Sequence, residues 1–386
     1  MLIGGGVYVE TCVTPARTAL FGSGGRAAMV VAGLGGAVVL HTFHPEALRD
    51  DVDANFNPAG IGVVVHSSPR RFCFEYLHPM ARPRIIPLPA GHPINVPLQG
   101  EEVLRFGCLE GDFRVAAARA VYDPQSGSDP APFGFNGSTA GSLAMILNAN
   151  ELRGMAGMDD LSHAATDVMR DAAASVLVVK DGPAGAYVFE GTCLPRHVPA
   201  YPTDSVYKIG SGDVFSATFA HAWMSDRVQA AEAADRASRR TAQYVETPAF
   251  PLPFELPHRA AGRTDARGRR VLLACDTRTA SRRWVWEEAA RGLRDLGATV
   301  VPGDSYSPAD WGLVAASVDK AAVDIVLAHC DDGRTAAAAL RAILTLGKPV
   351  VVFADDPAAL EAAGKLGVPG SADLCSALYR TQWVPL

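Results

Sequence analysis

A polar, basic stretch divides the sequence into two parts that each show the pattern of an α/β domain. His258 to Arg270 reads HRAAGRTDARGRR, without apolar periodicity, and it follows two prolines in Pro251-Leu252-Pro253-Phe254 that argue against a continuing helix. We therefore interpret residues 259–268 as a linker between domains at residues 1–258 and 269–386. With 386 residues, 48% of them hydrophobic, the chain is long enough to bury two cores.

The first part alternates apolar runs with glycine-rich turns and helical segments. The runs expected as strands include Ala37 to Phe43, Val115 to Tyr122 and Ser175 to Val179, and helices are expected after Ser138 and from about Asp213. Short runs between Pro- and Gly-rich turns indicate a β-rich insertion within about residues 60–110. This order predicts an α/β fold with a mainly parallel central sheet and a small β lid.

The second part repeats the pattern on a smaller scale. The expected strands are Val271 to Ala274, Thr299 to Val301, Ile325 to Ala328 and Val350 to Phe353, with helices between them. Such βα units in 118 residues predict a second, smaller, doubly wound Rossmann-like domain.

Composition argues against several classes of partner. The net charge of −6 and the lack of a Lys-rich run argue against nucleic-acid binding. The longest apolar run, Ala27 to Leu40, is broken by glycines and is too short to span a bilayer, so no membrane association is expected. Seven scattered cysteines without a C-x-x-C pair, and a start without a basic n-region, indicate reduced thiols in a cytoplasmic protein.

The strongest chemical motif is Gly210-Ser211-Gly212-Asp213, followed by an apolar helical run. Glycines let backbone N–H groups converge, and the N-terminus of the helix adds the positive end of its dipole, which together stabilise an anionic phosphoryl group. A carboxylate at such a turn repels phosphate but can accept a proton from an attacking hydroxyl. The alternative is a glycine-rich turn in which Asp213 only caps the helix.

Two further motifs fit the same chemistry. Asn148 and Glu151 stand three residues apart where a strand meets a helix, and such a pair suits a hydrated magnesium ion that bridges nucleotide phosphates. The alternative is a helix cap with an acid in the first turn. Val179 to Gly185 follows a buried strand and forms either a plain hairpin turn or the floor of a nucleotide pocket.

In order and spacing, these motifs resemble the ribokinase-like (pfkB) family of carbohydrate and nucleoside kinases. The matching pieces are Gly24-Gly25, Asp123-Pro124, Asn148 to Glu151, Gly182 to Gly185 and Gly210 to Asp213, and they cover most of residues 1–258. The resemblance implies a ribokinase-like sheet with a β lid, ATP with Mg²⁺ as donor, and transfer to a substrate hydroxyl. It implies Asp213 as the base and the N–H groups of Gly210, Ser211 and Gly212 as the anion hole. Lys180, Gly182, Gly185 and Lys208 would then bind ATP, and Asn148 and Glu151 the metal.

The sequence departs from that family at three places. Tyr207-Lys208 stands where Asp-Thr is usual, Arg26 follows the Gly-Gly turn in place of Asn, and Glu10 replaces an Asp of the first strand. We expect Glu10, Gly24, Gly25 and Arg26 to line the acceptor site. Because Arg26 is a bidentate donor, an acceptor that carries negative charge is our hypothesis, and an Arg26–Glu10 ion pair is the alternative.

The second part resembles the nucleoside 2-deoxyribosyltransferase family through Asp331-Asp332-Gly333-Arg334-Thr335 and Gly347-Lys348-Pro349. That family uses a Glu nucleophile on the helix after the first of these turns. Here the corresponding position falls near Ala339 in the run Ala336 to Ala339, which contains no carboxylate. A ligand held by Asp331, Asp332 and Thr335 is therefore expected to be sensed, not cleaved, and a purely structural domain is the alternative.

Three functions follow from these patterns. The leading one is an ATP-dependent kinase of a sugar, nucleoside or nucleotide with a C-terminal nucleotide-binding or regulatory domain. The second is a degenerate kinase fold that senses nucleotides without turnover. The third is an N-glycosidase or deoxyribosyltransferase, which would need a carboxylate from elsewhere, such as Asp276 or Glu287. The partner is a small molecule in each case, and the kinase resemblance is compatible with a homodimer.

Overall fold

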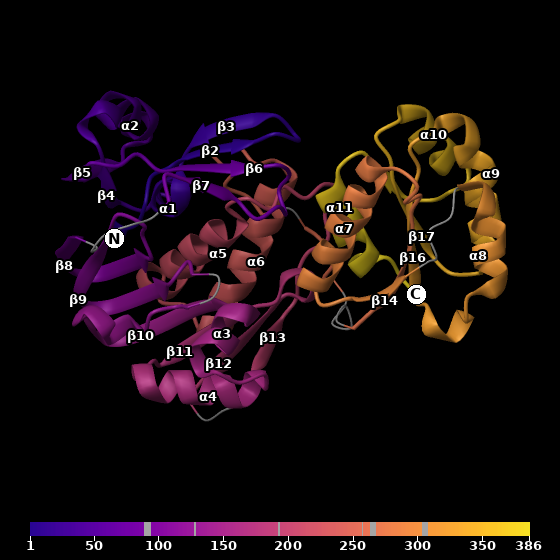
Figure 1. Ribbon diagram of the computed structural model, residues 1–386. Helices are drawn as coiled ribbons and strands as arrows, with labels where there is room; N and C mark the ends of the chain where they lie inside the picture. Colours follow the sequence, from indigo (N-terminus) through magenta and orange to yellow (C-terminus); the bar gives the residue numbers. More distant parts are fainter. Residues whose placement is uncertain (89–93, 127–128, 192–193, 257, 263–267, 303–307) are drawn as a thin grey trace. The chain divides into compact units, whose positions relative to one another are not determined.

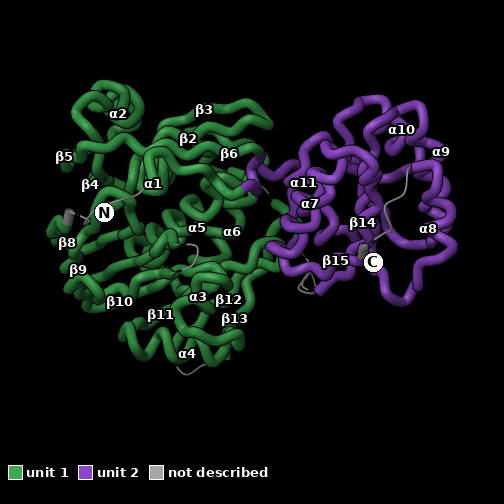
Figure 2. Tube along the Cα trace, in the orientation of Figure 1, with its two compact units in different colours: residues 1–77, 82–201, 208–260 green, residues 78–81, 202–207, 261–386 purple. Residues whose placement is uncertain are grey.

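The computed structural model describes residues 1–88, 94–126, 129–191, 194–256, 258–262, 268–302 and 308–386. The chain forms two compact units (Figure 2). Unit 1 comprises residues 1–77, 82–201 and 208–260, and unit 2 comprises residues 78–81, 202–207 and 261–386. Of the linker expected at residues 259–268, residues 263–267 lie outside the described part of the chain.

Unit 1 is built on a large, mostly parallel sheet. Within the described residues this sheet has nine strands in the order β13-β12-β11-β10-β9-β8-β1-β4-β5 (Figure 1). Its strands are β1 (Leu2–Gly4), β4 (Val39–His44), β5 (Gly62–Ser67), β8 (Ile94–Phe106), β9 (Gly111–Asp123), β10 (Thr139–Asn148), β11 (Val176–Lys180), β12 (Ala186–Glu190) and β13 (Arg196–Val198). All neighbours pair in parallel except β11 with β12 and β12 with β13.

Six helices of the described chain accompany this sheet. They are α1 (Gly22–Gly33), α2 (Arg49–Phe56), α3 (Ala149–Ala156), α4 (Leu161–Ala172), α5 (Ser211–Ala220) and α6 (Ala230–Glu246). Helices α1 and α6 both pack on α5, while α3 and α4 pack on each other and on β11. Apolar side chains of α3 and α4 join those of β8, β9, β10 and β11 in one buried cluster. The predicted α/β class with a mainly parallel central sheet is confirmed.

A second sheet of four described strands forms the lid, in the order β3-β2-β6-β7. Its strands are β2 (Val9–Cys12), β3 (Arg17–Leu20), β6 (Cys73–Tyr76) and β7 (Arg84–Ile86). Only β6 and β7 come from the stretch of about residues 60–110 that the sequence pattern assigned to the lid. β5 and β8 from that stretch pair in the large sheet instead, and the hairpin β2–β3 completes the lid from the N-terminal end.

The segment after Ser138 is a strand, so the expectation of a helix there was wrong. β10 lies between β9 and β11, and Leu143 to Leu147 are buried. A parallel strand that is covered on both faces carries a continuous apolar run. Leu, Ala and Met in that run are also strong helix formers, and this explains the error.

Strands β8 and β9 each bend back on themselves. They pair in parallel from Ile94–Gly111 to Phe106–Asp123, yet only residues 107–110 connect them. A straight strand of this length would measure about 40 Å, which four residues cannot span. In agreement, Gly4 pairs with Arg105, while a Cβ on Gly4 would also touch Leu98 and Phe113 from the other arms of the two strands.

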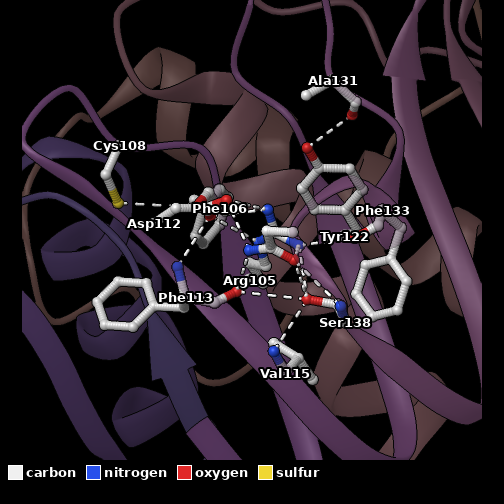
Figure 3. A network of polar contacts seen from close by, with 11 residues as sticks. Arg105, Phe106, Cys108, Asp112, Phe113, Val115, Tyr122, Ala131, Phe133 and Ser138 are labelled. Atoms are coloured by element: carbon white, nitrogen blue, oxygen red, sulfur yellow. Dashed lines mark hydrogen bonds and ion pairs between the residues drawn. The ribbon is translucent and has the colours of Figure 1, made fainter. Parts of the chain in front are cut away.

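Buried Arg105 joins the arms of these bent strands (Figure 3). It is 2% exposed and makes a bidentate ion pair with Asp112, at 2.7 and 2.8 Å. It also donates to the Phe133 carbonyl and the Ser138 hydroxyl, both at 3.0 Å, and its guanidinium lies 4.7 Å from the centre of the Tyr122 ring. A network satisfied in this way fixes the bend rather than a reaction centre.

We expect Arg105→Met to destabilise unit 1 by about 3 kcal/mol, because Asp112 and the Phe133 carbonyl lose their donor in a buried setting. Urea unfolding of the full chain at 25 °C measures this. Arg114→Met is the matched control, because Arg114 is exposed on the same strand β9 and its loss should change stability by less than about 0.5 kcal/mol. Equal stability of the two variants would contradict the structural role of Arg105.

Unit 2 is a smaller α/β unit. Its described strands form a five-stranded parallel sheet in the order β15-β14-β16-β17-β18. They are β14 (Arg270–Ala274), β15 (Thr299–Pro302), β16 (Ile325–His329), β17 (Val350–Phe353) and β18 (Gly370–Ser371), with helices α7 (Ala280–Asp295), α8 (Trp311–Ser317), α9 (Gly333–Leu344), α10 (Pro357–Lys365) and α11 (Leu374–Trp383). This is a doubly wound sheet whose strand order reverses between β14 and β16.

Two short segments from the first 260 residues belong to unit 2. His78 Nε2 lies 3.0 Å from a carboxylate oxygen of Glu288 on α7. The backbone N–H of Val206 donates to the hydroxyl of Ser376 on α11, at 2.8 Å. No pattern in the sequence indicated that these segments would pack with the C-terminal part.

Candidate active site

The motif Gly210 to Asp213 forms the N-terminus of the buried helix α5. Gly210 caps the helix with φ of 79°, a left-handed conformation that favours glycine, and a Cβ there would lie 2.0 Å from Arg26 Nε. Asp213 stands in the first turn and is 6% exposed. The N–H of Ser211 donates to the Lys208 carbonyl at 3.0 Å, so this N–H closes the turn that precedes α5. The N–H groups of Gly212 and Asp213 belong to the first turn, where a helix offers them no carbonyl of its own.

Arg26 on α1 is held tightly beside Asp213. Its Nη1 donates to Asp213 Oδ2 at 2.6 Å and to the Gly22 carbonyl at 3.2 Å, and its guanidinium pairs with both carboxylate oxygens of Glu10 on β2. Its Nε donates to the Tyr244 hydroxyl at 3.1 Å. The structure thus contains the Arg26–Glu10 ion pair that the sequence left open, and it adds Asp213 as a second anionic partner.

Gly24 and Gly25 serve close packing in this region. A Cβ on Gly24 would lie 2.6 Å from the backbone of Gly5, and one on Gly25 would lie 2.6 Å from the ring of Phe56. Gly24 thus lets α1 approach the end of β1, and Gly25 lets α1 pack on the Phe56 ring of α2. Their contact with a substrate stays a prediction.

Lys180 at the end of β11 lies beside the candidate anion hole. Its Nζ is 2.8 Å from Asp123 Oδ2 and 3.5 Å from the position that a Cβ on Gly212 would take. Burial alone lowers the pKa of Lys180, but the charges of Asp123 and Glu151 outweigh this and raise the pKa above its ordinary value. Lys180 is therefore a fixed positive charge next to the turn that precedes Asp213.

Asp123 at the end of β9 connects the parts of the site. It is 1% exposed and accepts hydrogen bonds from Lys180, from the Ser216 hydroxyl at 2.6 Å, and from the Gln125 backbone N–H at 3.3 Å. The Gln125 side chain in turn donates to Asp213 Oδ1 at 3.1 Å. Asp123 had been noted in the sequence only as the end of a strand, and Gln125, Ser216 and Tyr244 had not been singled out.

Burial raises the pKa values of two carboxyl groups of the site, Asp213 and Glu151. The pKa of Asp213 rises to about 6, because burial and the charges of Glu10 and Asp123 outweigh the effect of Arg26. The pKa of Glu151 rises to about 7 through burial and the nearby Asp123. Such shifts gather at functional sites, where a base must be poised near neutral pH.

Asn148 and Glu151 form the N-terminal cap of α3, as the alternative interpretation of this motif held. The Asn148 side chain accepts from the N–H of Asn150 and of Glu151, and the Glu151 carboxylate accepts from the Asn148 N–H at 2.7 Å. Among the described residues no three His, Cys, Asp or Glu side chains gather as a metal cluster. A Mg²⁺ ion usually needs only one or two carboxylates plus water and phosphate, and the excess negative charge of Asp123 and Glu151 fits that requirement.

The other residues predicted to bind ATP, Gly182, Gly185 and Lys208, have different structural roles. Gly182 and Gly185 belong to the hairpin turn between β11 and β12, and a Cβ on Gly185 would clash with the Val198 carbonyl at 2.1 Å. The plain hairpin is thus present. Lys208 is exposed and contributes its carbonyl to the turn before α5. A role of these residues in ATP binding stays a prediction.

Unit 2 brings charged residues together where its strand order reverses. Asp276 follows β14, and Asp331 follows β16. Arg282 on α7 pairs with both, and Arg278 also pairs with Asp276 at 2.8 Å. His329 at the end of β16 is 4% exposed, and neither of its ring nitrogens has a hydrogen-bond partner within the described chain. In open α/β sheets this edge is where ligands bind.

The other predicted ligand residues of unit 2 are used by helix α9. Asp332 caps the helix by accepting from the Arg334 N–H at 3.0 Å, and it pairs with the Arg334 side chain. The Thr335 hydroxyl donates to the Asp332 carbonyl at 3.2 Å. Ala336 and Ala339 are buried on the same helix and offer no carboxylate.

The match to a known family lies within the first 260 residues of the chain. Residues 135–253 match the family described as pfkB family carbohydrate kinase. No curated protein matches the chain. Among solved structures, a pyrophosphate-dependent myo-inositol-1 kinase converted into a myo-inositol-3 kinase is 17% identical, with a TM-score of 0.50 over 66% of this chain and 95% of that one.

Two further structures show the same coverage. Ribokinase from Thermotoga maritima is 18% identical, with a TM-score of 0.47 over 65% of this chain and 95% of that chain. Aminoimidazole riboside kinase from Salmonella enterica is 15% identical, with a TM-score of 0.47 over 64% of this chain and 93% of that chain.

The resemblance of unit 2 to deoxyribosyltransferases stays a prediction. No helix in the described ranges has the length and apolarity needed to cross a bilayer. Unit 1 therefore has a ribokinase-like fold, and residues 135–253 match the pfkB family of carbohydrate kinases.

Proposed function

We propose that unit 1 is an ATP- and Mg²⁺-dependent phosphotransferase that phosphorylates a hydroxyl of a sugar, nucleoside or nucleotide. One observation supports this function: a buried carboxylate and a fixed cation both lie at the N-terminus of the same helix. Asp213 stands in the first turn of α5, and the Lys180 ammonium lies beside Gly212 in the same turn. The match of residues 135–253 to carbohydrate kinases supports the same chemistry.

Each group has a distinct task in this proposal. Asp213 accepts the proton of the attacking hydroxyl, and its pKa of about 6 keeps it ionised at neutral pH. The first-turn N–H groups and Lys180 stabilise the negative charge that develops on the transferred phosphoryl group. Asp123 and Glu151, beside Asn148, would hold Mg²⁺, which neutralises charge on the donor phosphates when it is bound.

The ion pairs of Arg26 make an anionic acceptor less favourable than the sequence indicated. Arg26 already pairs with Glu10 and Asp213, so an anionic acceptor would have to displace one of these carboxylates. An acceptor with neutral hydroxyls, a sugar or nucleoside, avoids this cost. We therefore place these ahead of the phosphorylated or acidic acceptors that Arg26 alone had indicated.

One observation favours a second candidate, a kinase fold that binds nucleotides without turnover. Both carboxylate oxygens of Asp213 accept hydrogen bonds from within the chain, one from Arg26 and one from Gln125. A base held in this way is protected from an acceptor. The two candidates differ in whether phosphate appears on an acceptor.

Unit 2 supplies a regulatory or ligand-binding function in this proposal. The buried imidazole of His329 and the Asp276–Arg282–Asp331 ion pairs lie at the edge of the sheet where ligands bind. The lack of a carboxylate at Ala336 to Ala339 argues against N-glycosidase or deoxyribosyltransferase activity.

The test is a phosphoryl-transfer screen of the full chain with MgATP. Sugars, nucleosides and nucleotides are supplied in turn to wild type and to Asp213→Asn, and phosphorylated product is detected by mass spectrometry. We expect product from wild type with a neutral hydroxyl acceptor. ATP binding without product for any acceptor would instead establish the nucleotide sensor.

A further inference from the structure

The candidate base is capped on both of its oxygens. Asp213 Oδ2 lies 2.6 Å from Arg26 Nη1, and Asp213 Oδ1 lies 3.1 Å from Gln125 Nε2. A general base must offer an oxygen within hydrogen-bond reach of the proton that it takes. A carboxylate oxygen can accept a second hydrogen bond, but Asp213 is only 6% exposed, so the place of one of these two donors is the most direct position for an incoming hydroxyl.

The two donors differ in how firmly they are held. Arg26 is 2% exposed and also binds Glu10, the Gly22 carbonyl and the Tyr244 hydroxyl. Moving it would leave buried charges without a partner, which is among the most costly changes inside a protein. The Gln125 residue is exposed, so its amide can exchange the bond to Asp213 for bonds to water. Gln125 is therefore the donor that leaves.

The backbone holds Gln125 in place for this contact. Its φ of 55° is left-handed, which is uncommon for a residue other than glycine, and its N–H donates to Asp123 Oδ1 at 3.3 Å. Strain of this kind persists where the surrounding structure enforces it, and it gathers at functional sites. The turn thus presents the Gln125 amide to Asp213 Oδ1.

We propose that the Gln125 amide occupies the place of the acceptor hydroxyl at Asp213 Oδ1, and that it must swing away before transfer. Gln125 is then a positioning residue that keeps water from the base and sets the affinity for the acceptor. This inference rests on the phosphotransferase function proposed above. In the reaction that it suppresses, a water oxygen bonds to the γ-phosphorus of ATP and the bond to the β,γ-bridging oxygen breaks. ADP leaves with that electron pair, phosphate is formed, and the water proton passes to Asp213 Oδ1.

The experiment measures hydrolysis of MgATP without acceptor by wild type, Gln125→Ala, Gln125→Gly and the double variant Gln125→Ala with Asp213→Asn. We expect both single variants to release phosphate about tenfold faster than wild type, which corresponds to 1.36 kcal/mol. The double variant is expected to lose this gain. With an acceptor found in the screen, KM should fall about tenfold in Gln125→Ala while kcat stays unchanged, which loss of structure alone would not produce.

The outcomes separate the inference from the function on which it rests. Hydrolysis that depends on Asp213 but is equal in wild type and Gln125→Ala would overturn the role of Gln125 and leave the phosphotransferase intact. A gain in Gln125→Gly alone would assign the effect to relief of the left-handed backbone and would also overturn it. If no variant shows Asp213-dependent hydrolysis although wild type phosphorylates an acceptor, the role of Gln125 fails alone. If MgATP binds but neither hydrolysis nor transfer to any acceptor occurs, the proposed function fails, and the role of Gln125 fails with it.

Discussion

Asp213→Asn is expected to lower kcat for phosphoryl transfer by about 10²- to 10⁴-fold, the range that a positioned general base contributes. The amide keeps the shape of the side chain and can still accept from Arg26, but it cannot take a proton. Transfer to the acceptor found in the screen, at saturating MgATP, gives the measurement. The effect should lie in kcat more than in the KM for ATP, because Asp213 acts on the acceptor and not on the donor.

The pH dependence of the wild type provides a second measure of the same group. The raised pKa of Asp213 means that the base is protonated, and inactive, below about pH 6. The value of kcat/KM should therefore rise with pH through about 6 and then level off. The profile is best recorded with saturating Mg²⁺, because the bound cation keeps Glu151 ionised. The protonation of Glu151, whose pKa is about 7, then adds no second pH-dependent step to the profile.

Asp226→Asn serves as the matched control for this variant. Asp226 carries the same side chain in the same unit, but it is 40% exposed and pairs with Arg236 at the surface. The substitution should leave kcat unchanged, and kcat/KM should still rise with pH through about 6. An Asp213→Asn variant that stays folded and transfers phosphate at the rate of this control would remove Asp213 from the mechanism.

Patterns local in sequence predicted the fold class and the main motif, while contacts distant in sequence escaped prediction. The turn Gly210 to Asp213 is visible because its glycines and its acid are adjacent. The ion pair between Arg26 and Asp213 joins residues 187 positions apart, and the contact between Gln125 and Asp213 spans 88. Side chains of these types pair in many ways, so a single sequence does not indicate which partners the fold selects.

The same limit applied to the fold itself. The alternation of strands and helices was clear, but the lid takes β2 and β3 from the N-terminal end because strand pairing is set by topology and not by proximity in sequence. The sharp bends of β8 and β9 depend on Arg105, whose charge would ordinarily indicate a surface position. A buried arginine can be recognised only when its partners are known.

Lys180→Met is expected to lower phosphoryl transfer by about 10²- to 10³-fold, the effect of removing one donor from an anion hole. The variant loses the ammonium that lies beside Gly212 and balances Asp123. Since Asp123 is 1% exposed, the unpaired carboxylate should also destabilise unit 1, by about 3 kcal/mol. The measurements are kcat at saturating MgATP and urea unfolding of the same preparations.

Lys180→Arg separates charge from packing in this test. Arginine keeps the positive charge near Asp123, although its planar, bulkier head does not reproduce the geometry of an ammonium. It should therefore retain most of the stability and only part of the transfer rate. Lys365→Met, at an exposed lysine of unit 2, should change neither quantity. If Lys180→Met loses stability but its folded fraction transfers phosphate at the wild-type rate, Lys180 serves only to balance Asp123, and the charge of the anion hole must come from the first turn of α5 alone.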